Sequence, residues 1–177
     1  MDDLSQHVLM VTSKAMAVRF HPAGKKRSVD KETGEEQFND VLKRQGRISQ
    51  GVKGVNLAED DHLVGLIVSG DEEASILTIS TNGMAKRSRL GSGEMVAQVD
   101  EESGDALLDD QGQPVMDRDG YRLSNRGTKG VRTMSLDDGD AVVSVRQVRH
   151  ESDQLFLLTG KGMMLRIPAR QSKETKG

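Results

Sequence analysis

The sequence predicts an all-β protein made of repeated, propeller-like blades, each a sheet of four antiparallel strands. Three observations lead to this fold class. Segments of the chain recur at one fixed offset, the one that separates Arg47 from Arg126, and apolar runs of strand length end at glycine-containing turns. Hydrophobic residues also make up only 34% of the 177 residues, so the core has to be thin and divided among small sheets.

The repeat covers most of each unit. At the common offset, residues 47–57 match 126–136, residues 63–66 match 142–145, and residues 79–87 match 158–166. A partial copy at residues 8–20 precedes them, with Ala15 at the position of the turn glycine, and residues 175–177 begin another copy. Because one such unit buries too little apolar surface alone, the copies are expected to pack side by side around an axis.

Two hairpins are expected in every full unit. In the first unit, Val52–Leu57 would pair with Leu63–Val68, and Ser75–Ser80 would pair with Met84–Arg89 through a turn that contains Gly83. The second unit repeats this plan, with strands expected at residues 131–136, 142–148, 154–159 and 163–167. Two hairpins then make one four-stranded blade.

This plan divides the chain into six segments. We expect the end of a preceding blade at 1–20, a polar linker or insertion at 21–46, a full blade at 47–90, an acidic surface insertion at 91–124, a second full blade at 125–169 and the start of a further blade at 170–177. About two full blades plus fragments are too few to close a ring of the usual blade number. The sequence is therefore interpreted as a fragment of a longer protein.

Charge is distributed unevenly along the chain. The formal net charge is −3, but residues 91–120 hold nine acidic residues and a single base, Arg118. The remainder of the chain is consequently basic, and Lys25, Lys26, Arg27, Lys43 and Arg44 enrich the other polar stretch. A chain of this kind can bind a polyanion despite its negative total, because local charge matters more than the sum.

Several classes of protein are disfavoured. Cysteine is absent, which excludes disulfides and thiolate metal sites, and aromatic residues amount to 2%, too few for platforms on which bases stack. No EF-hand loop spacing or His-x-x-x-His pair is present, so no metal site is expected. The start of the chain does not resemble a signal peptide and no apolar run reaches about 20 residues, so we expect a cytoplasmic protein that does not contact membranes.

Catalysis by this chain is not expected. The sequence contains no Gly-x-Ser-x-Gly elbow, no phosphate-binding loop of the Gly-x-x-x-x-Gly-Lys-Ser/Thr type and no recognisable pair of nucleophile and base. The one tyrosine, Tyr121, borders the acidic insertion, which is a poor setting for a nucleophile that attacks DNA.

Cations recur at equivalent positions of the repeats. Arg47 matches Arg126, Lys53 matches Arg132, and Arg87 matches both Arg166 and Arg19. On a curved stack of blades, such residues would form a track for the phosphates of duplex DNA, without sequence preference. The expected DNA-binding residues are Arg19, Arg47, Lys53, Lys86, Arg87, Arg89, Arg126, Lys129, Arg132, Lys161 and Arg166. The alternative is a propeller that binds proteins, in which these are ordinary solvated charges.

Two motifs in fixed order resemble a known family. Residues 50–57 (QGVKGVNL) and 76–87 (ILTISTNGMAKR) are similar to the repeat in the C-terminal domain of the gyrase A protein, where a Gly-Val-(Arg/Lys)-Gly turn and an Asn-Gly-x-x-Lys-Arg hairpin recur. Residues 11–20 also resemble the end of a preceding blade. The resemblance implies a six-bladed β-pinwheel whose rim binds, bends and wraps duplex DNA, so that the type IIA topoisomerase introduces negative supercoils.

The resemblance also implies the context of the domain. It would be a non-catalytic, nucleoid-associated part of an ATP-dependent bacterial topoisomerase, joined to the rest of the A subunit and to the ATPase B subunit. The active-site tyrosine, ATP and Mg²⁺ would belong to other parts of the enzyme, so no cofactor is expected here. The gyrase box Gln-Arg-Arg-Gly-Gly-Lys-Gly is absent, with degenerate forms at 47–54 and 126–133, and the topoisomerase IV version of the domain stays an alternative.

Overall fold

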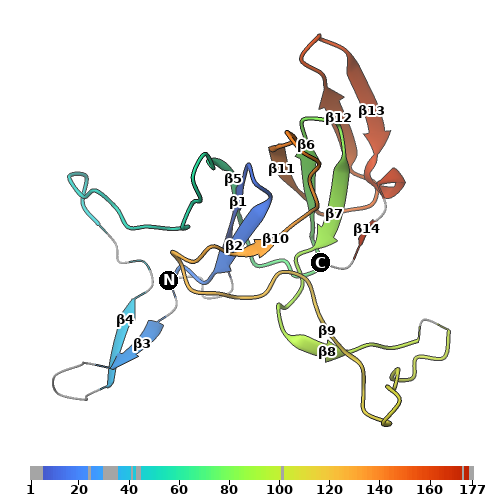
Figure 1. Ribbon diagram of the computed structural model, residues 1–177, viewed down its shortest axis with the longest axis horizontal. Helices are drawn as coiled ribbons and strands as arrows, with labels where there is room; N and C mark the ends of the chain where they lie inside the picture. Colours follow the sequence, from blue (N-terminus) through green and yellow to red (C-terminus); the bar gives the residue numbers. More distant parts are fainter. Residues whose placement is uncertain are drawn as a thin grey trace.

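The protein is almost entirely β structure (Figure 1). The computed structural model describes residues 6–23, 25–29, 36–40, 42, 45–100, 102–172 and 174–175. Within these residues, the one helical element is a short 3₁₀ turn, η1 (Ala169–Gln171). The predicted all-β fold class is confirmed by the antiparallel sheets described below.

The first four-stranded sheet has the strand order β10-β2-β1-β5. Strands β1 (His7–Thr12) and β2 (Met16–Phe20) form a hairpin, with Leu9 opposite Arg19. Strand β5 (Leu63–Ser69) pairs antiparallel with β1, and the short β10 (Val131–Arg132) pairs antiparallel with β2. This sheet therefore combines strands from three separate parts of the chain.

The second sheet repeats this arrangement, with the strand order β11-β6-β7-β14. Strands β6 (Ser75–Ser80) and β7 (Ala85–Arg89) form its hairpin, with Leu77 opposite Arg87. Strand β11 (Val142–Val148) pairs with β6, and β14 (Glu174–Thr175) runs parallel to β7. A third hairpin, β12 (Gln154–Leu158) with β13 (Met164–Pro168), follows and extends beyond the second sheet in Figure 1.

One contiguous repeat does not fold into one sheet, contrary to the expected pairing of Val52–Leu57 with Leu63–Val68. Strand β5 pairs with β1 of the preceding hairpin, whereas β6 and β7 of the same repeat lie in the second sheet. Residues 52–57 form no strand, because the amide of Asn56 donates to the carbonyl oxygen of Thr128 instead. One repeat thus contributes strands to two neighbouring blades, and this holds the blades together.

Two aspartates at equivalent repeat positions fix this sharing of strands. Asp61 Oδ1 accepts hydrogen bonds from the amides of Lys14 and His62, at 3.0 and 2.9 Å. Asp140 Oδ1 does the same for the amides of Asn82 and Ala141, at 3.0 and 2.9 Å. Each carboxylate therefore fastens the loop before β5 or β11 onto the turn of the preceding hairpin.

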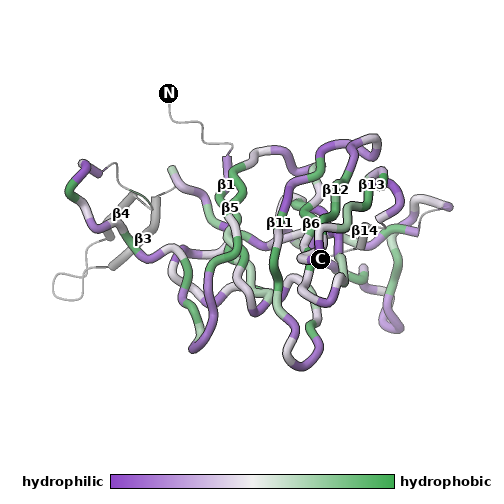
Figure 2. Tube along the Cα trace, turned by 90° about the horizontal axis from the view of Figure 1, so that it is seen from above, coloured by the Kyte–Doolittle hydropathy of each residue, from purple (hydrophilic) through white to green (hydrophobic). Residues whose placement is uncertain are grey.

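The main core lies between the two sheets. It includes Leu9 and Val11 of β1, Ile76 of β6, and Val142 and Val145 of β11. Figure 2 shows apolar stretches along β11, β12 and β13. No residue of β12 or β13 is fully buried. The exposed large hydrophobic side chains of the β12–β13 hairpin are Phe156, Leu158, Met163, Met164 and Leu165. Among the described residues, the buried side chains form three clusters, so the core is divided as the composition predicts.

Both interruptions of the repeat contain hairpins. In the acidic insertion, β8 (Met95–Ala97) pairs with β9 (Met116–Arg118), and isolated bridges join Val99 to Ala106 and Leu108 to Pro114. This arm projects away from the two sheets (Figure 1). In the first interruption, β3 (Lys25–Val29) pairs with β4 (Glu36–Asp40). The basic residues Lys43 and Arg44 and the last two residues, 176–177, lie outside the described part.

Candidate nucleic-acid interface

The two basic copies of the repeat motif lie side by side. The Gly127 amide donates to the carbonyl oxygen of Gly54 at 2.6 Å, and Asn56 donates to Thr128 at 2.9 Å. Arg126 Nη1 donates to the carbonyl oxygen of Lys53 at 3.0 Å. We call residues 47–57 and 126–133 the paired basic loops. Segments far apart in the sequence thereby form one continuous surface.

A glycine allows the second loop to approach β2. Gly130 has φ +83, and a Cβ atom there would lie 2.1 Å from the carbonyl oxygen of Ala17. Only a residue without a side chain fits such a contact with the backbone. The next residue, Val131, then pairs with Ala17, and the Thr133 amide donates to the carbonyl oxygen of Ala15 at 2.8 Å. The loop is therefore held in place by the first sheet.

The paired basic loops carry positive charge without any acidic residue. Their cations are Arg47, Lys53, Arg126, Lys129 and Arg132, and neither segment contains Asp or Glu although the chain has 28 acidic residues. Arg47, Lys53, Lys129 and Arg132 are exposed, and Arg126 is half-buried. Lys53 and Arg126 are thus brought together, with Lys129 and Arg132 farther along the second loop and Arg47 at the start of the first.

Arg19 differs from the expectation of a rim cation. Its side chain is 2% exposed, and Nη1 donates to the carbonyl oxygens of Leu90, Gly91 and Tyr121 at 2.8–2.9 Å. Burial lowers the pKa of its guanidinium, and the acidic groups of Glu72 and Asp119 oppose that shift. Arg19 thus binds the first hairpin to the segment that follows the second, and it cannot reach a phosphate outside.

Arg87 and Arg89 are engaged with acidic residues. Arg87 is 4% exposed, and its Nη2 lies 2.8 Å from Glu151 Oε1. Arg89 is partly exposed, contacts Glu73 and lies 3.7 Å from Asp119 Oδ1. Arg87 is the equivalent of Arg19 in the second hairpin, and it is buried in the same way. Its position therefore also differs from the exposed rim position that the sequence predicts.

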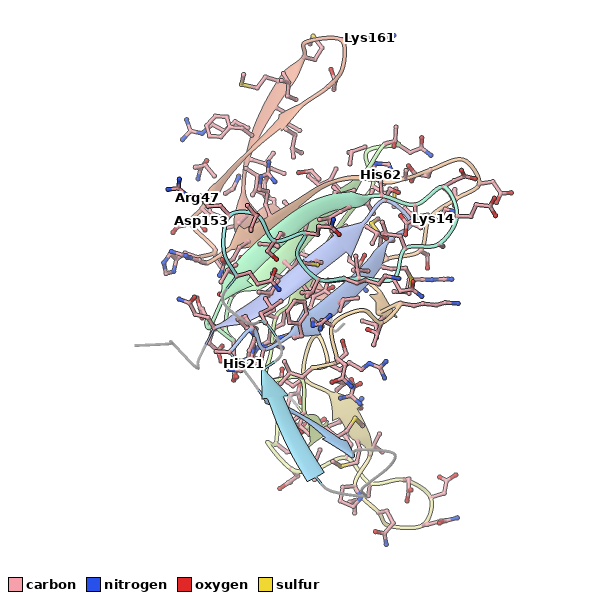
Figure 3. The ribbon with its side chains drawn as sticks, turned by 90° about the vertical axis from the view of Figure 1, so that its left-hand side faces the viewer. Lys14, His21, Arg47, His62, Asp153 and Lys161 are labelled. Carbon is pink, nitrogen blue, oxygen red and sulfur yellow. The ribbon has the colours of Figure 1, made fainter. Side chains whose placement is uncertain are left out.

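The remaining candidates lie on the second and third hairpins. Lys86 is half-buried on β7, and Lys161 is exposed. Figure 3 shows Lys161 at the far end of the β12–β13 hairpin, well separated from Arg47. Arg166 is exposed, stacks over the Phe156 ring at 5.6 Å and donates to Gln154 Oε1 at 3.1 Å. These residues are therefore not part of the paired basic loops.

A histidine beside Arg19 makes the packing of the first hairpin sensitive to pH. His7 Nδ1 accepts hydrogen bonds from Arg19 Nη2 and Nε, at 2.7 and 3.2 Å, so the imidazole has to be neutral. Burial, then Arg19, then His21 lower the pKa of His7 below its ordinary value of 6.5. His21 packs edge-on at 5.2 Å between ring centroids.

We expect stability to decrease as the pH falls. A histidine with a lowered pKa in the folded state contributes fully above the unfolded pKa of about 6.5, and this contribution is lost as pH falls through the folded pKa. Urea unfolding at about pH 7.5 and about pH 5.5 measures the effect. His7→Asn keeps an acceptor that does not titrate, so its pH dependence should be smaller. An unchanged pH dependence would contradict the role of His7.

Tyr121 is unsuited to nucleophilic attack. It is 4% exposed and belongs to the core between the sheets, and burial raises the pKa of its phenol to about 12. In the described part of the chain, no group of three His, Asp or Glu side chains is arranged to hold a metal ion. No described helix is long and apolar enough to cross a bilayer.

The sheets and the shared strands define a class of repeat protein, an all-β array of blades. Comparison with known proteins identifies the family. A model described as "DNA gyrase C-terminal domain, beta-propeller" matches residues 40–69, 74–92, 115–149 and 153–171, more than half of the chain. The chain therefore belongs to the family of C-terminal domains of type IIA topoisomerase A subunits.

Relatives and solved structures agree with this family. The DNA gyrase A protein of Staphylococcus aureus (strain MRSA252) is 32% identical over 92% of this chain, and that of Helicobacter pylori (strain J99) is 29% identical over 73%. The chain spans 13% and 12% of these relatives. The gyrase A C-terminal domain structure (TM-score 0.55, 21% identity) and the topoisomerase IV C-terminal domain structure (TM-score 0.56, 16% identity) share the fold, over 99% of this chain and 43% and 57% of theirs.

Proposed function

We propose that this chain binds duplex DNA without sequence preference, as part of a domain that wraps DNA for a type IIA topoisomerase. One observation supports the proposal: two hydrogen-bonded loops carry five cations on acid-free segments of a chain that is acidic in total. Phosphate contacts of this kind position a protein on DNA but do not read its sequence. The set of residues that we expect to contact DNA is therefore reduced to Arg47, Lys53, Arg126, Lys129 and Arg132.

The geometry of the loops supports phosphate contact more than binding of a protein partner. Four of the five cations are exposed, and backbone hydrogen bonds hold the loops that carry them side by side. Bending a site of 20–30 base pairs costs about 1–6 kcal/mol, so a wrap needs several blades acting together. We accordingly expect this chain alone to bind duplex weakly.

Binding to random-sequence duplex should weaken linearly when the logarithm of affinity is plotted against the logarithm of salt concentration. The double variant Lys53→Gln/Lys129→Gln removes two exposed cations, so the magnitude of the slope should fall by about 2. Fluorescence anisotropy between about 50 and 200 mM salt measures it. The control variant Arg149→Gln/Arg170→Gln removes two exposed charges outside the paired basic loops and should leave the slope unchanged. No duplex binding by the unmodified chain, or an equal change in the control, would favour the protein-binding alternative.

Within the same function, we favour the gyrase version, which produces negative supercoils. The relatives named above are gyrase A proteins, although the topoisomerase IV domain has the same fold. On this proposal the partners are duplex DNA, the remainder of the A subunit and the ATPase B subunit, in the bacterial cytoplasm at the nucleoid. The active-site tyrosine, ATP and Mg²⁺ belong to those other parts. A minicircle assay on the whole parent protein distinguishes the gyrase version from the topoisomerase IV version. If the protein does not constrain writhe, DNA wrapping is excluded.

A further inference from the structure

A pocket of about 350 Å³ lies where the first and second sheets meet the base of the acidic arm. Three separate segments line it. Arg132 belongs to β10 of the first sheet and Ser88 to β7 of the second. Arg118 is the last residue of β9 in the acidic arm, and Arg122 follows it in the chain. The volume is at the lower end of the range for small-ligand sites. The pocket therefore depends on the neighbouring blades and on the insertion together.

Its charge is one-sided. Of the described residues that line it, three are arginines and none is acidic. In the described part of the chain, the side chains of Arg122 and Arg132 form no hydrogen bond or ion pair, and Arg118 Nη1 donates to the carbonyl oxygen of Gly93 at 2.7 Å. Among the described residues, the acidic side chains of the arm therefore do not line the pocket. Arginine is always protonated, so the three guanidinium groups give the pocket a positive potential that favours an anion.

The floor of the pocket is fixed by the backbone. The Tyr121 amide donates to the carbonyl oxygen of Leu90 at 3.0 Å, and the Ser124 amide donates to that of Arg19 at 2.8 Å. A Cβ atom on Gly120 would lie 2.3 Å from the carbonyl oxygen of Leu90, so the segment that bears Arg118 and Arg122 packs closely on the second sheet. The arginines are therefore carried by an ordered frame, which lowers the cost of gathering them around a ligand.

We propose that this pocket binds a phosphate group. The planar guanidinium presents donors in a fork that matches phosphate oxygens, and several arginines around one site are typical of phosphate recognition. Arg118 and Arg122 lie outside the paired basic loops, whereas Arg132 belongs to them, so the pocket adjoins the proposed DNA surface and extends it. The phosphate belongs either to the backbone of a duplex or to a free phosphate-containing ligand, and both present the same oxygens.

Calorimetric titration of the whole chain with inorganic pyrophosphate at low salt tests the proposal. The unmodified chain should bind, and Arg122→Gln should weaken binding by about tenfold or more, because it removes a charge-assisted hydrogen bond. The control Arg149→Gln removes an exposed arginine remote from the lining residues and should leave the affinity unchanged. Circular dichroism checks that both variants fold. No binding by the unmodified chain, or equal weakening by the control, would overturn the proposal.

Duplex binding by the same variants then distinguishes the two sources of phosphate. If Arg122→Gln weakens both pyrophosphate and duplex binding, the pocket receives a backbone phosphate. If it weakens pyrophosphate binding alone, the ligand is a free phosphate compound. If the chain binds pyrophosphate but no duplex, the phosphate pocket stands and the proposed function fails. If it instead self-associates through Arg122 and binds no pyrophosphate, the pocket takes a carboxylate of a second copy and the phosphate proposal is wrong.

Discussion

Arg19→Ala should lower the free energy of unfolding by about 3–5 kcal/mol. The substitution leaves the buried carbonyl oxygens of Leu90, Gly91 and Tyr121 without their donor, and each unpaired buried group costs about 1–3 kcal/mol. It also opens a cavity where a long, fully enclosed side chain lay. Since a domain is stable by about 5–15 kcal/mol in total, the loss is large enough to measure by urea unfolding.

The repeat supplies a matched control for this experiment. Arg166 occupies the equivalent position of the third hairpin, opposite Phe156 as Arg19 is opposite Leu9, but it is exposed. Arg166→Ala removes a cation–π contact and should cost less than about 1 kcal/mol. If Arg19→Ala fails to fold, Arg19→Lys should give an intermediate loss, because an ammonium group replaces only some of the donors. Equal losses at positions 19 and 166 would show that the buried hydrogen bonds contribute little.

The contrast between these arginines also explains where sequence reasoning succeeds. The local pattern locates most strands closely: it predicts β6 at Ser75–Ser80 and β11 at residues 142–148, which are their observed bounds. Alternating apolar residues and turn glycines act within a hairpin, so they are visible in the sequence. The burial of Arg19 depends on Leu90, Gly91 and Tyr121, which lie far along the chain. Its match to Arg166 in sequence therefore leads to the wrong expectation of a rim cation.

The pairing of strands escapes prediction for the same physical reason. Residues 52–57 have the composition of a strand, yet their backbone bonds go to the loop that contains Thr128. A strand forms only where a partner edge is available, and that edge is set by contacts between blades. The sequence signal that could reveal the sharing of strands between blades is the equivalence of Asp61 and Asp140, which each lie two residues before a strand. The sequence predicts the five cations of the paired basic loops individually, but their grouping requires the structure.

Gly130→Ala should lower the free energy of unfolding by about 2–4 kcal/mol. The φ of +83 costs an alanine about 1–2 kcal/mol, and the added Cβ would approach the carbonyl oxygen of Ala17 to 2.1 Å, so the loop has to move off β2. Loss of that contact should also speed hydrogen exchange of the Thr133 amide, which donates to the carbonyl oxygen of Ala15. Urea unfolding and amide exchange measure the two effects. Because the loop carries Lys129 and Arg132, weaker duplex binding is expected as well.

Gly51 separates the strain of the backbone from the close approach. It is the repeat equivalent of Gly130 and has nearly the same φ, +78, but a Cβ atom added to it would meet no heavy atom within 4 Å. Gly51→Ala therefore meets only the conformational cost, about 1–2 kcal/mol, and should leave exchange at Thr133 unchanged. If both alanine variants lose the same stability, the left-handed backbone alone explains the glycines. A larger loss at Gly130 means that the contact with β2 fixes the second basic loop.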